Sequence, residues 1–171
     1  MKFDDVFFSQ FWPGFFSTTL GGISLTLIYF LFKEKFFSLP VIAGVWECET
    51  TTLDTKYNGH RGMTIWYRVT LLQSGATITG MGEKEREDAR DGKREYEGKH
   101  RRTTHINGAI NKKFFGSDEV VIFWRENGQE RESGSYFRLR VSGCKAKGDL
   151  WGRFYASASK SSGTASWKRI A

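Results

Sequence analysis

Hydrophobic and polar residues divide the chain into two parts with different patterns. Phe15–Phe32 is a run of eighteen residues without a charged side chain, and a helix of that length covers about 27 Å, close to the hydrocarbon thickness of a bilayer. From Val41 onward the chain is polar, charged and rich in the β-branched and aromatic residues that favour strands. The pattern predicts an aromatic segment and a transmembrane helix in residues 1–39, followed by one domain in residues 40–171.

Two other interpretations of the apolar run fit the sequence less well than a membrane helix. A cleavable signal peptide starts with positive charge and ends in a small-residue cleavage site, whereas this chain begins MKFDD. A core helix is rarely apolar on every face. A retained helix fits best, and Lys33 and Lys35 directly after it predict that the N-terminus lies outside and the domain in the cytoplasm.

Small residues recur along one side of the predicted helix. Thr18, Gly22 and Thr26 are spaced four apart, with Gly21 beside them. Small residues at this spacing allow two membrane helices to approach closely. We therefore expect these four residues to mediate association between copies of the chain, although small residues are also common in membrane helices without that role.

Turn signals follow one another regularly after residue 42. They are Asn58-Gly59, Ser74-Gly75, Asp91-Gly92, Gly116-Ser117-Asp118, Asn127-Gly128, the stretch from Gly143 to Gly148, and Ser162-Gly163. Asn-Gly and Asp-Gly pairs are strong hairpin signals because both central residues of the turn take positive φ. Seven turns leave eight segments, the fourth being residues 93–115, and no long helical period lies between them. The sequence therefore predicts an all-β fold, an eight-stranded antiparallel meander barrel, with a two-sheet sandwich as the alternative.

Alternation within the segments predicts which side chains face the interior. The expected inward residues include Trp46, Cys48, Thr50, Met63, Ile65, Tyr67, Val69, Leu71, Phe137, Leu139, Val141, Ala165, Trp167 and Arg169. Gly80, Gly108 and Gly152 interrupt three segments, and we interpret them as sites of bending or close packing. The dense charges between Glu83 and Arg102 predict a long hairpin that projects past the rim.

Trp46 and Arg169 are expected to close one end of the barrel. They lie near the start of the first segment and the end of the last, and these two segments are neighbours in a closed barrel. An inward arginine can stack on an indole ring. We predict a structural plug, and direct ligand contact by Trp46 is the lesser alternative.

The opposite end is the predicted ligand site. Candidate ligand-binding residues with inward parity are Thr50, Tyr67, Tyr96, Arg102 and Thr104. Aromatic rings stack on bases and arginine binds phosphate, although each residue taken alone also suits a core or rim role. A single β-bulge would reverse the inferred parity between residues 85 and 103.

Composition narrows the chemistry. The net charge of +7 suits an anionic partner. Cys48 and Cys144 are the only cysteines and do not have metal-ligand spacing, and no phosphate loop or catalytic motif is present. We therefore expect no metal, no cofactor and no enzymatic activity.

The sequence predicts a short apolar N-terminal anchor followed by a minimal barrel that opens with Ile42-Ala-Gly-Val-Trp-Glu-Cys-Glu49. In this arrangement the chain resembles the membrane-anchored β-barrel effectors of CBASS antiphage systems. The resemblance covers nearly the whole chain, mostly as architecture, size and order. Lipocalins, fatty-acid-binding proteins and avidins share similar Gly-x-Trp and strand-glycine motifs. No ligand residue is carried over from the family.

The resemblance implies a function. A cognate nucleotidyltransferase would make a cyclic dinucleotide, the cytoplasmic barrel would bind it, and the chain would form homo-oligomers that disrupt inner-membrane lipid and kill the infected cell. It implies no nucleic-acid polymer as partner. Two alternatives stay open from the sequence: a membrane-anchored, lipocalin-like binder of lipid or another small apolar ligand, and an enzyme at the membrane surface.

Overall fold

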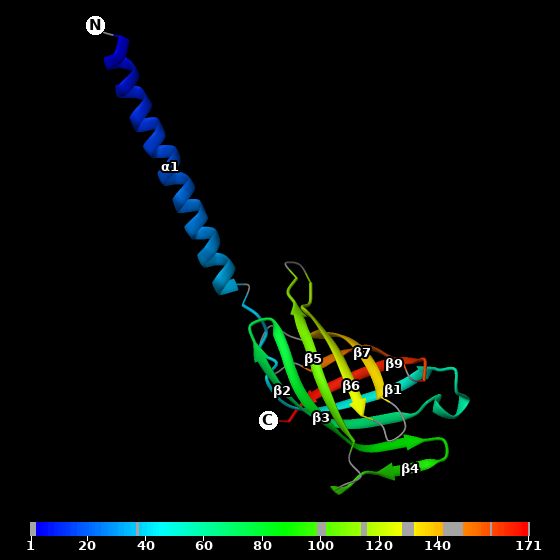
Figure 1. Ribbon diagram of the computed structural model, residues 1–171. Helices are drawn as coiled ribbons and strands as arrows, with labels where there is room; N and C mark the ends of the chain where they lie inside the picture. The colour runs from blue at the N-terminus through cyan, green and yellow to red at the C-terminus, as the bar shows by residue number, and fades with distance from the viewer. Residues whose placement is uncertain are drawn as a thin grey trace. The chain divides into compact units, whose positions relative to one another are not determined.

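The computed structural model describes residues 3–36, 38–98, 102–113, 116–127, 132–141, 149–157 and 159–170. The chain divides into two compact units, Met1–Ser38 and Leu39–Ala171. The first unit is helix α1 (Phe3–Phe36), and the second contains all the strands (Figure 1).

Helix α1 includes a segment that is long and apolar enough to cross a membrane. This segment is Phe11–Phe32, and none of it is buried, which distinguishes it from a core helix. A membrane anchor and a signal sequence both have this character. Among the residues whose burial is described, every buried hydrophobic residue lies at Ile42 or beyond, so the core of the second unit is formed by its own strands and the segment just before them.

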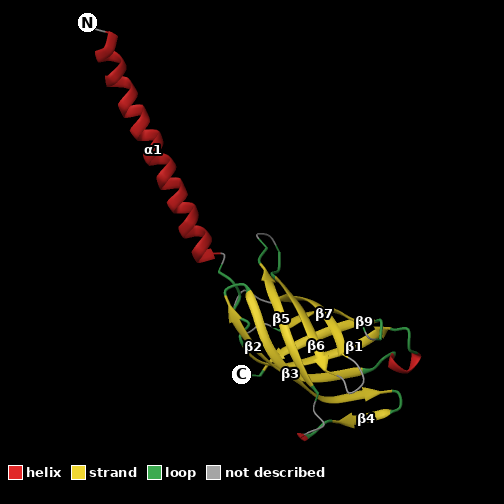
Figure 2. Ribbon diagram, in the orientation of Figure 1, coloured by secondary structure: helices red, strands yellow, loops and turns green. Residues whose placement is uncertain are grey.

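The second unit is an all-β barrel. Its strands are β1 (Gly44–Asp54), β2 (Thr64–Ser74), β3 (Thr77–Ala89), β4 (Gly92–Glu95), β5 (Thr103–Asn111), β6 (Glu119–Asn127), β7 (Glu132–Val141), β8 (Leu150–Ala156) and β9 (Ser161–Arg169), and a 3₁₀ turn η1 (Asn58–His60) follows β1. The order is β2-β1-β9-β8-β7-β6-β5-β3-β4, with all pairings antiparallel, and β2 also pairs with β3. This last pairing closes a ring of eight strands, so the predicted eight-stranded antiparallel meander barrel is confirmed and the sandwich is wrong (Figure 2).

The structure corrects the predicted fourth segment. Residues 93–115 were expected to form one strand, but β4 and β5 are separate, and only β5 pairs within the ring. β4 pairs with the end of β3 across the Asp91-Gly92 turn, from Arg86 to Ala89. The two strands form a hairpin that continues beyond the barrel, as the charge pattern predicted (Figure 1).

The expected turn at Ser162-Gly163 is wrong. Both residues lie inside β9, and the turn comes earlier, where Lys160 has a φ of 47°. Gly163 is needed for close packing, because a Cβ there would overlap the carbonyl oxygen of Thr51 and lie 2.9 Å from the Phe154 ring. The Ser-Gly pair therefore reflects contact between β9 and β1 rather than a reversal of the chain.

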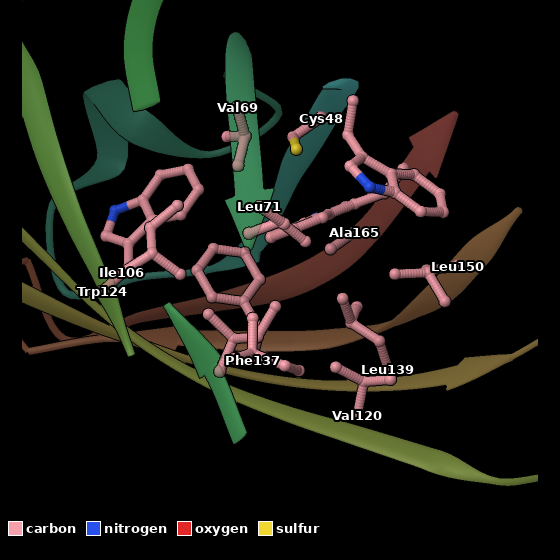
Figure 3. Close-up of a cluster of buried hydrophobic side chains, with 14 of the residues drawn as sticks. Cys48, Val69, Leu71, Ile106, Val120, Trp124, Phe137, Leu139, Leu150 and Ala165 are labelled. Carbon is pink, nitrogen blue, oxygen red and sulfur yellow. The ribbon is translucent and has the colours of Figure 1, made fainter. Parts of the chain in front are cut away.

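Burial follows the predicted alternation, and the interior changes character along the barrel. Aromatic and aliphatic side chains fill one end and the middle (Figure 3), with Trp124 and Phe137 ring centroids 4.8 Å apart. Along β1 the inward residues pass from Trp46 through Cys48 to the buried hydroxyls of Thr50 and Thr52. One end of the barrel is therefore apolar and packed, and the other is polar.

Arg169 lies over Trp46 at the packed end. The two residues are direct partners in the β1–β9 register, with the guanidinium carbon 5.3 Å from the ring centroid. The Trp46 indole donates a hydrogen bond of 2.9 Å to the Ile42 carbonyl, and Arg169 donates one to the Ala43 carbonyl. The chain thus covers this end with its own first and last barrel residues.

Replacing Gly152 with alanine should destabilise the barrel by about 1–3 kcal/mol, because the new Cβ would overlap the Arg138 carbonyl of the adjacent strand. Gly59→Ala is the matched control, since no atom lies within 4 Å of its Cβ position and its φ is not positive. Chemical unfolding of both variants gives the comparison. Equal stabilities would show that the strand glycines are not required for packing.

Arg169→Ala should lower the unfolding free energy by about 1–2 kcal/mol, because it removes the contact with the buried Trp46 ring. Lys168→Ala, one residue earlier and exposed on the outer face, is the control. A melting temperature unchanged by Arg169→Ala would contradict a stabilising plug.

Candidate functional site

A cavity of about 430 Å³ lies at the polar end of the barrel. Its wall is mixed: rings and aliphatic groups form the floor, and hydroxyls and charges lie nearer the mouth. The lining residues are Thr50, Thr52, His60, Met63, Ile65, Tyr67, Lys84, Arg102, Trp124, Glu126, Ser133, Ser135, Phe137, Phe154, Ala156, Ser159 and Ser161. The volume is in the range typical of small-molecule sites.

A second cavity of about 590 Å³ adjoins the first, on the side of the β3–β4 hairpin. Tyr96, Arg94 and Glu87 line it. Lys84 and Arg102 line both cavities. Two cations therefore lie at the boundary between two spaces that each contain an aromatic ring.

A β-bulge places two opposite charges on the same inner side of β3. In the β2–β3 register Tyr67 pairs with Lys84 whereas Trp66 pairs with Arg86, so Glu85 is the additional residue. The bulge shifts the alternation, and as a result both Lys84 and Glu87 are buried, at 5% and 7% exposure.

The buried charges at the mouth are paired. The Lys84 ammonium lies 2.5 Å from a Glu87 carboxylate oxygen and 4.8 Å from the centroid of the Tyr96 ring. Arg94 contacts the other Glu87 oxygen at 3.4 Å. These contacts satisfy the charges without an exogenous ligand and hold Lys84 beside an aromatic ring.

A second network joins Tyr67 and Arg102, two of the predicted ligand residues. The Tyr67 hydroxyl donates a hydrogen bond of 3.2 Å to Glu126, and Arg102 lies 3.6 Å from the other oxygen of that carboxylate. The Tyr67 ring packs edge-on against Trp124, with centroids 4.5 Å apart. Glu126 therefore links an aromatic floor to a cationic mouth.

The local environment fixes the protonation states. Burial by itself raises the pKa of Glu87, but the hydrogen bond and charge of Lys84 outweigh it and hold that pKa below its usual value. Burial, and then the charge of Glu126, raise the pKa of Tyr67 well above its usual value. Burial and the hydrogen bond to Glu87 raise the pKa of Tyr96. At neutral pH the mouth thus offers protonated tyrosine donors beside an ionised glutamate.

The structure brings most of the predicted ligand residues together. Thr50, Tyr67 and Arg102 line the first cavity and Tyr96 lines the second. Thr104 lines neither: it is fully buried behind Gly82, and its hydroxyl has no hydrogen-bond partner within the described residues. We therefore assign Thr104 to the wall of the barrel rather than to the cavity surface.

Sequence reasoning missed Lys84, Glu87 and Glu126. Glu126 has the inward parity of Trp124 two residues earlier, so alternation could have identified it. Lys84 and Glu87 depend on the bulge at Glu85, which no sequence signal reveals. Among the described residues, no group of three His, Cys, Asp or Glu side chains is arranged to hold a metal ion.

No protein-family model, curated protein or solved structure matches this chain. The function of the chain is therefore inferred from the side chains at the mouth of the barrel.

The lowered pKa of Glu87 predicts an acid-sensitive barrel. A carboxylate whose pKa is lower in the folded chain than in the unfolded chain stabilises the fold above its unfolded pKa, and that stability is lost as the pH falls through the folded value. We expect the unfolding free energy of the wild type to decrease below pH 4.5, the ordinary value for this side chain. Glu87→Gln should weaken this decrease.

Glu119 should also make the unfolding free energy decrease at acidic pH, because Arg138 lowers the pKa of that carboxyl. Glu119→Gln is therefore the companion variant, and the double variant should show the flattest profile. Denaturant titrations between pH 3 and 7 measure the effect. Identical profiles for the wild type and Glu87→Gln would contradict an ionised, Lys84-paired Glu87.

Proposed function

We propose that the chain is a membrane-anchored receptor whose barrel binds a cyclic dinucleotide at its polar end. The observation that carries this proposal is the position of Lys84 and Arg102 at the boundary of two adjoining cavities. Tyr67 lines one cavity and Tyr96 the other. Two aromatic sites separated by two cations suit two bases joined through phosphates.

The ion pairs at the mouth suggest how binding would occur. A phosphate oxygen would replace a Glu126 oxygen beside Arg102 and a Glu87 oxygen beside Lys84, which the chain holds at 3.6 Å and 2.5 Å. One base would stack against the Tyr67 and Trp124 rings and the other against Tyr96. The carboxylates keep the cations in place before the ligand arrives, and they move aside as the phosphate oxygens take their positions.

The lining of the first cavity argues against a purely apolar ligand, the lipocalin-like alternative. Charged side chains and hydroxyls line this cavity, and the hydroxyls include those of Thr52, Ser133 and Ser161. A lipid chain at this position would remove water from these groups without replacing their hydrogen bonds, which is costly. The apolar floor at Trp124 and Phe154 suits a base ring instead.

An enzyme, the other alternative, would also need a cluster of titratable groups inside the barrel. We assign Tyr67, Glu126, Lys84 and Glu87 to binding, because each cation is already paired with a carboxylate. Conversion of a bound nucleotide to a new product by the purified chain would assign them to catalysis instead.

The proposed consequence of binding is antiphage defence at the bacterial inner membrane. A nucleotidyltransferase activated by infection would supply the ligand, and the cytoplasmic barrel would receive it. Ligand-bound chains would assemble through helix α1 and disrupt the membrane, killing the infected cell. The apolar segment Phe11–Phe32 supports anchoring in this scheme.

Arg102→Gln should weaken binding of a cyclic dinucleotide by about ten- to a hundred-fold, because it removes a charge-assisted contact at the boundary of the cavities. Arg153→Gln removes the same charge from the exposed outer face of β8 and should bind like the wild type. Calorimetry of the full chain in detergent against a panel of cyclic oligonucleotides measures both variants. Absence of binding to every member at micromolar concentration would refute the receptor.

A shallow groove on α1 includes three of the four predicted association residues, and Gly21 is not part of its lining. The groove is lined by Thr18, Thr19, Gly22, Ile23, Thr26, Leu27, Phe30 and Leu31. Thr18 and Thr26 donate hydrogen bonds of 2.9 and 2.8 Å to carbonyls one turn earlier, so their hydroxyls are satisfied within the helix. The groove is therefore suited to close packing of a second helix.

Gly22→Leu should fill this groove and reduce ligand-dependent assembly and toxicity several-fold while nucleotide binding stays unchanged. Ser24→Leu makes a comparable increase in size on the opposite side of the helix, two residues away. Crosslinking in membranes and cell survival during expression report the difference. If the two variants assemble equally well, the groove is not the contact between helices.

A further inference from the structure

The outer face of β6, β7 and β8 carries aromatic rings in cross-strand register. Phe123 pairs with Tyr136, and Tyr136 pairs with Tyr155. Their exposed fractions are 48%, 44% and 49%. Phe123 lies across Gly134, where an added Cβ would be 3.3 Å from the ring. The three rings thus form a continuous row on the outside of the barrel, away from the cavities.

Arginines occupy the neighbouring rows of the same face. Arg138 pairs in register with Arg153, and Arg140 pairs with Trp151. The Arg140 guanidinium carbon lies 5.6 Å from the centroid of the Trp151 ring, which is 52% exposed. We call this surface, made of Phe123, Tyr136, Arg138, Arg140, Trp151, Arg153 and Tyr155, the aromatic–arginine face.

The charge of this face is only partly balanced. Arg138 is paired with Glu119. Glu119 is also the cross-strand partner of Arg140, whose charge helps to lower the pKa of that carboxyl. Arg153 forms no ion pair within the part of the chain that the structure describes. The face therefore combines half-exposed rings with an excess of positive charge, because three arginines share the carboxylate of Glu119.

We propose that the aromatic–arginine face lies against the anionic lipid surface of the membrane to which the chain is anchored. Tyrosine and tryptophan rings favour the headgroup region, and arginine is attracted to anionic lipid. The inference rests on the membrane anchor of the proposed function, but it does not depend on the identity of the nucleotide.

The chain itself keeps the barrel close to a membrane. α1 ends at Phe36 and β1 begins at Gly44, so a short connection tethers the barrel to any bilayer that α1 crosses. A tether raises the effective concentration of the lipid surface, and a weak contact then becomes populated.

A second copy of the chain is less well matched. The outer side of β1–β3 carries acidic residues that would have to meet the arginines, but Glu47 is already paired with Arg86 at 3.6 Å, and Glu85 with Arg68 at 2.9 Å. Charge complementarity is therefore greater with anionic lipid than with another barrel.

The test uses the full chain, carrying Trp12→Phe, at one copy per nanodisc. The discs contain lipids brominated near the headgroup, either zwitterionic alone or with about one third anionic lipid. Bromine quenches nearby tryptophan fluorescence, and the part of the quenching lost in Trp151→Phe reports contact by this face. We expect Trp151-dependent quenching in anionic discs and several-fold less in zwitterionic ones.

The double variant Arg140→Gln, Arg153→Gln should lower the equilibrium constant for contact between this face and the lipid about twenty-five-fold. Each charge removed lowers that constant about five-fold. Lys56→Gln with Lys93→Gln removes the same charge from exposed positions outside the face and should quench like the parent. Nucleotide binding should be unchanged in both double variants, because neither touches the cavities.

Absence of Trp151-dependent quenching in anionic discs, or equal loss in the two double variants, would overturn the proposal. A signal that requires two copies per disc would assign the face to a second barrel. Binding of a single-stranded oligonucleotide that only the arginine variant abolishes, without quenching by lipid, would assign it to nucleic acid. If the chain binds no nucleotide, the proposed receptor function is overturned but the quenching should be unchanged. If the chain does not enter the discs, both the membrane anchor and this inference are overturned.

Discussion

Pairing of the first and last barrel strands is the constraint on which the rest of the molecule depends. The β1–β9 ladder joins the two ends of the barrel sequence and sets Trp46 opposite Arg169. This register fixes which end of the barrel is covered, because the indole and guanidinium meet where the chain enters and leaves the sheet. The same ladder carries the inward side of β1 from an apolar start to the hydroxyls of Thr50 and Thr52. The polar end is thereby left for a ligand.

A local irregularity then determines the chemistry of that end. The bulge at Glu85 turns Lys84 and Glu87 to the same side, and two buried charges in contact stabilise each other where either alone would be costly. Arg102 and Glu126 form the neighbouring pair. The cations are thus held by carboxylates in fixed positions, an arrangement that an anionic ligand can enter by exchanging one anion for another.

The architecture was predictable from the sequence because turns and alternation are local signals. Asp91-Gly92 marks a hairpin and the parity of Trp46, Tyr67 and Phe137 identifies the inner side, all without knowledge of the fold. What failed depends on contacts between distant residues. Gly163 could be recognised as a packing glycine only with Thr51 beside it, and Thr104 could be separated from the ligand residues only once Gly82 was seen to cover it. The bulge has no local signature, so Lys84 and Glu87 could not be assigned from the sequence.

A structure of the chain crystallised with the cyclic dinucleotide that binds best would test the central claim most directly. The account predicts phosphate oxygens within hydrogen-bond distance of Arg102 and Lys84, one base against Tyr67 and Trp124, and the other against Tyr96. It also predicts that the Arg102–Glu126 and Lys84–Glu87 contacts lengthen from 3.6 and 2.5 Å. A ligand bound elsewhere on the chain, with both ion pairs unchanged, would contradict it.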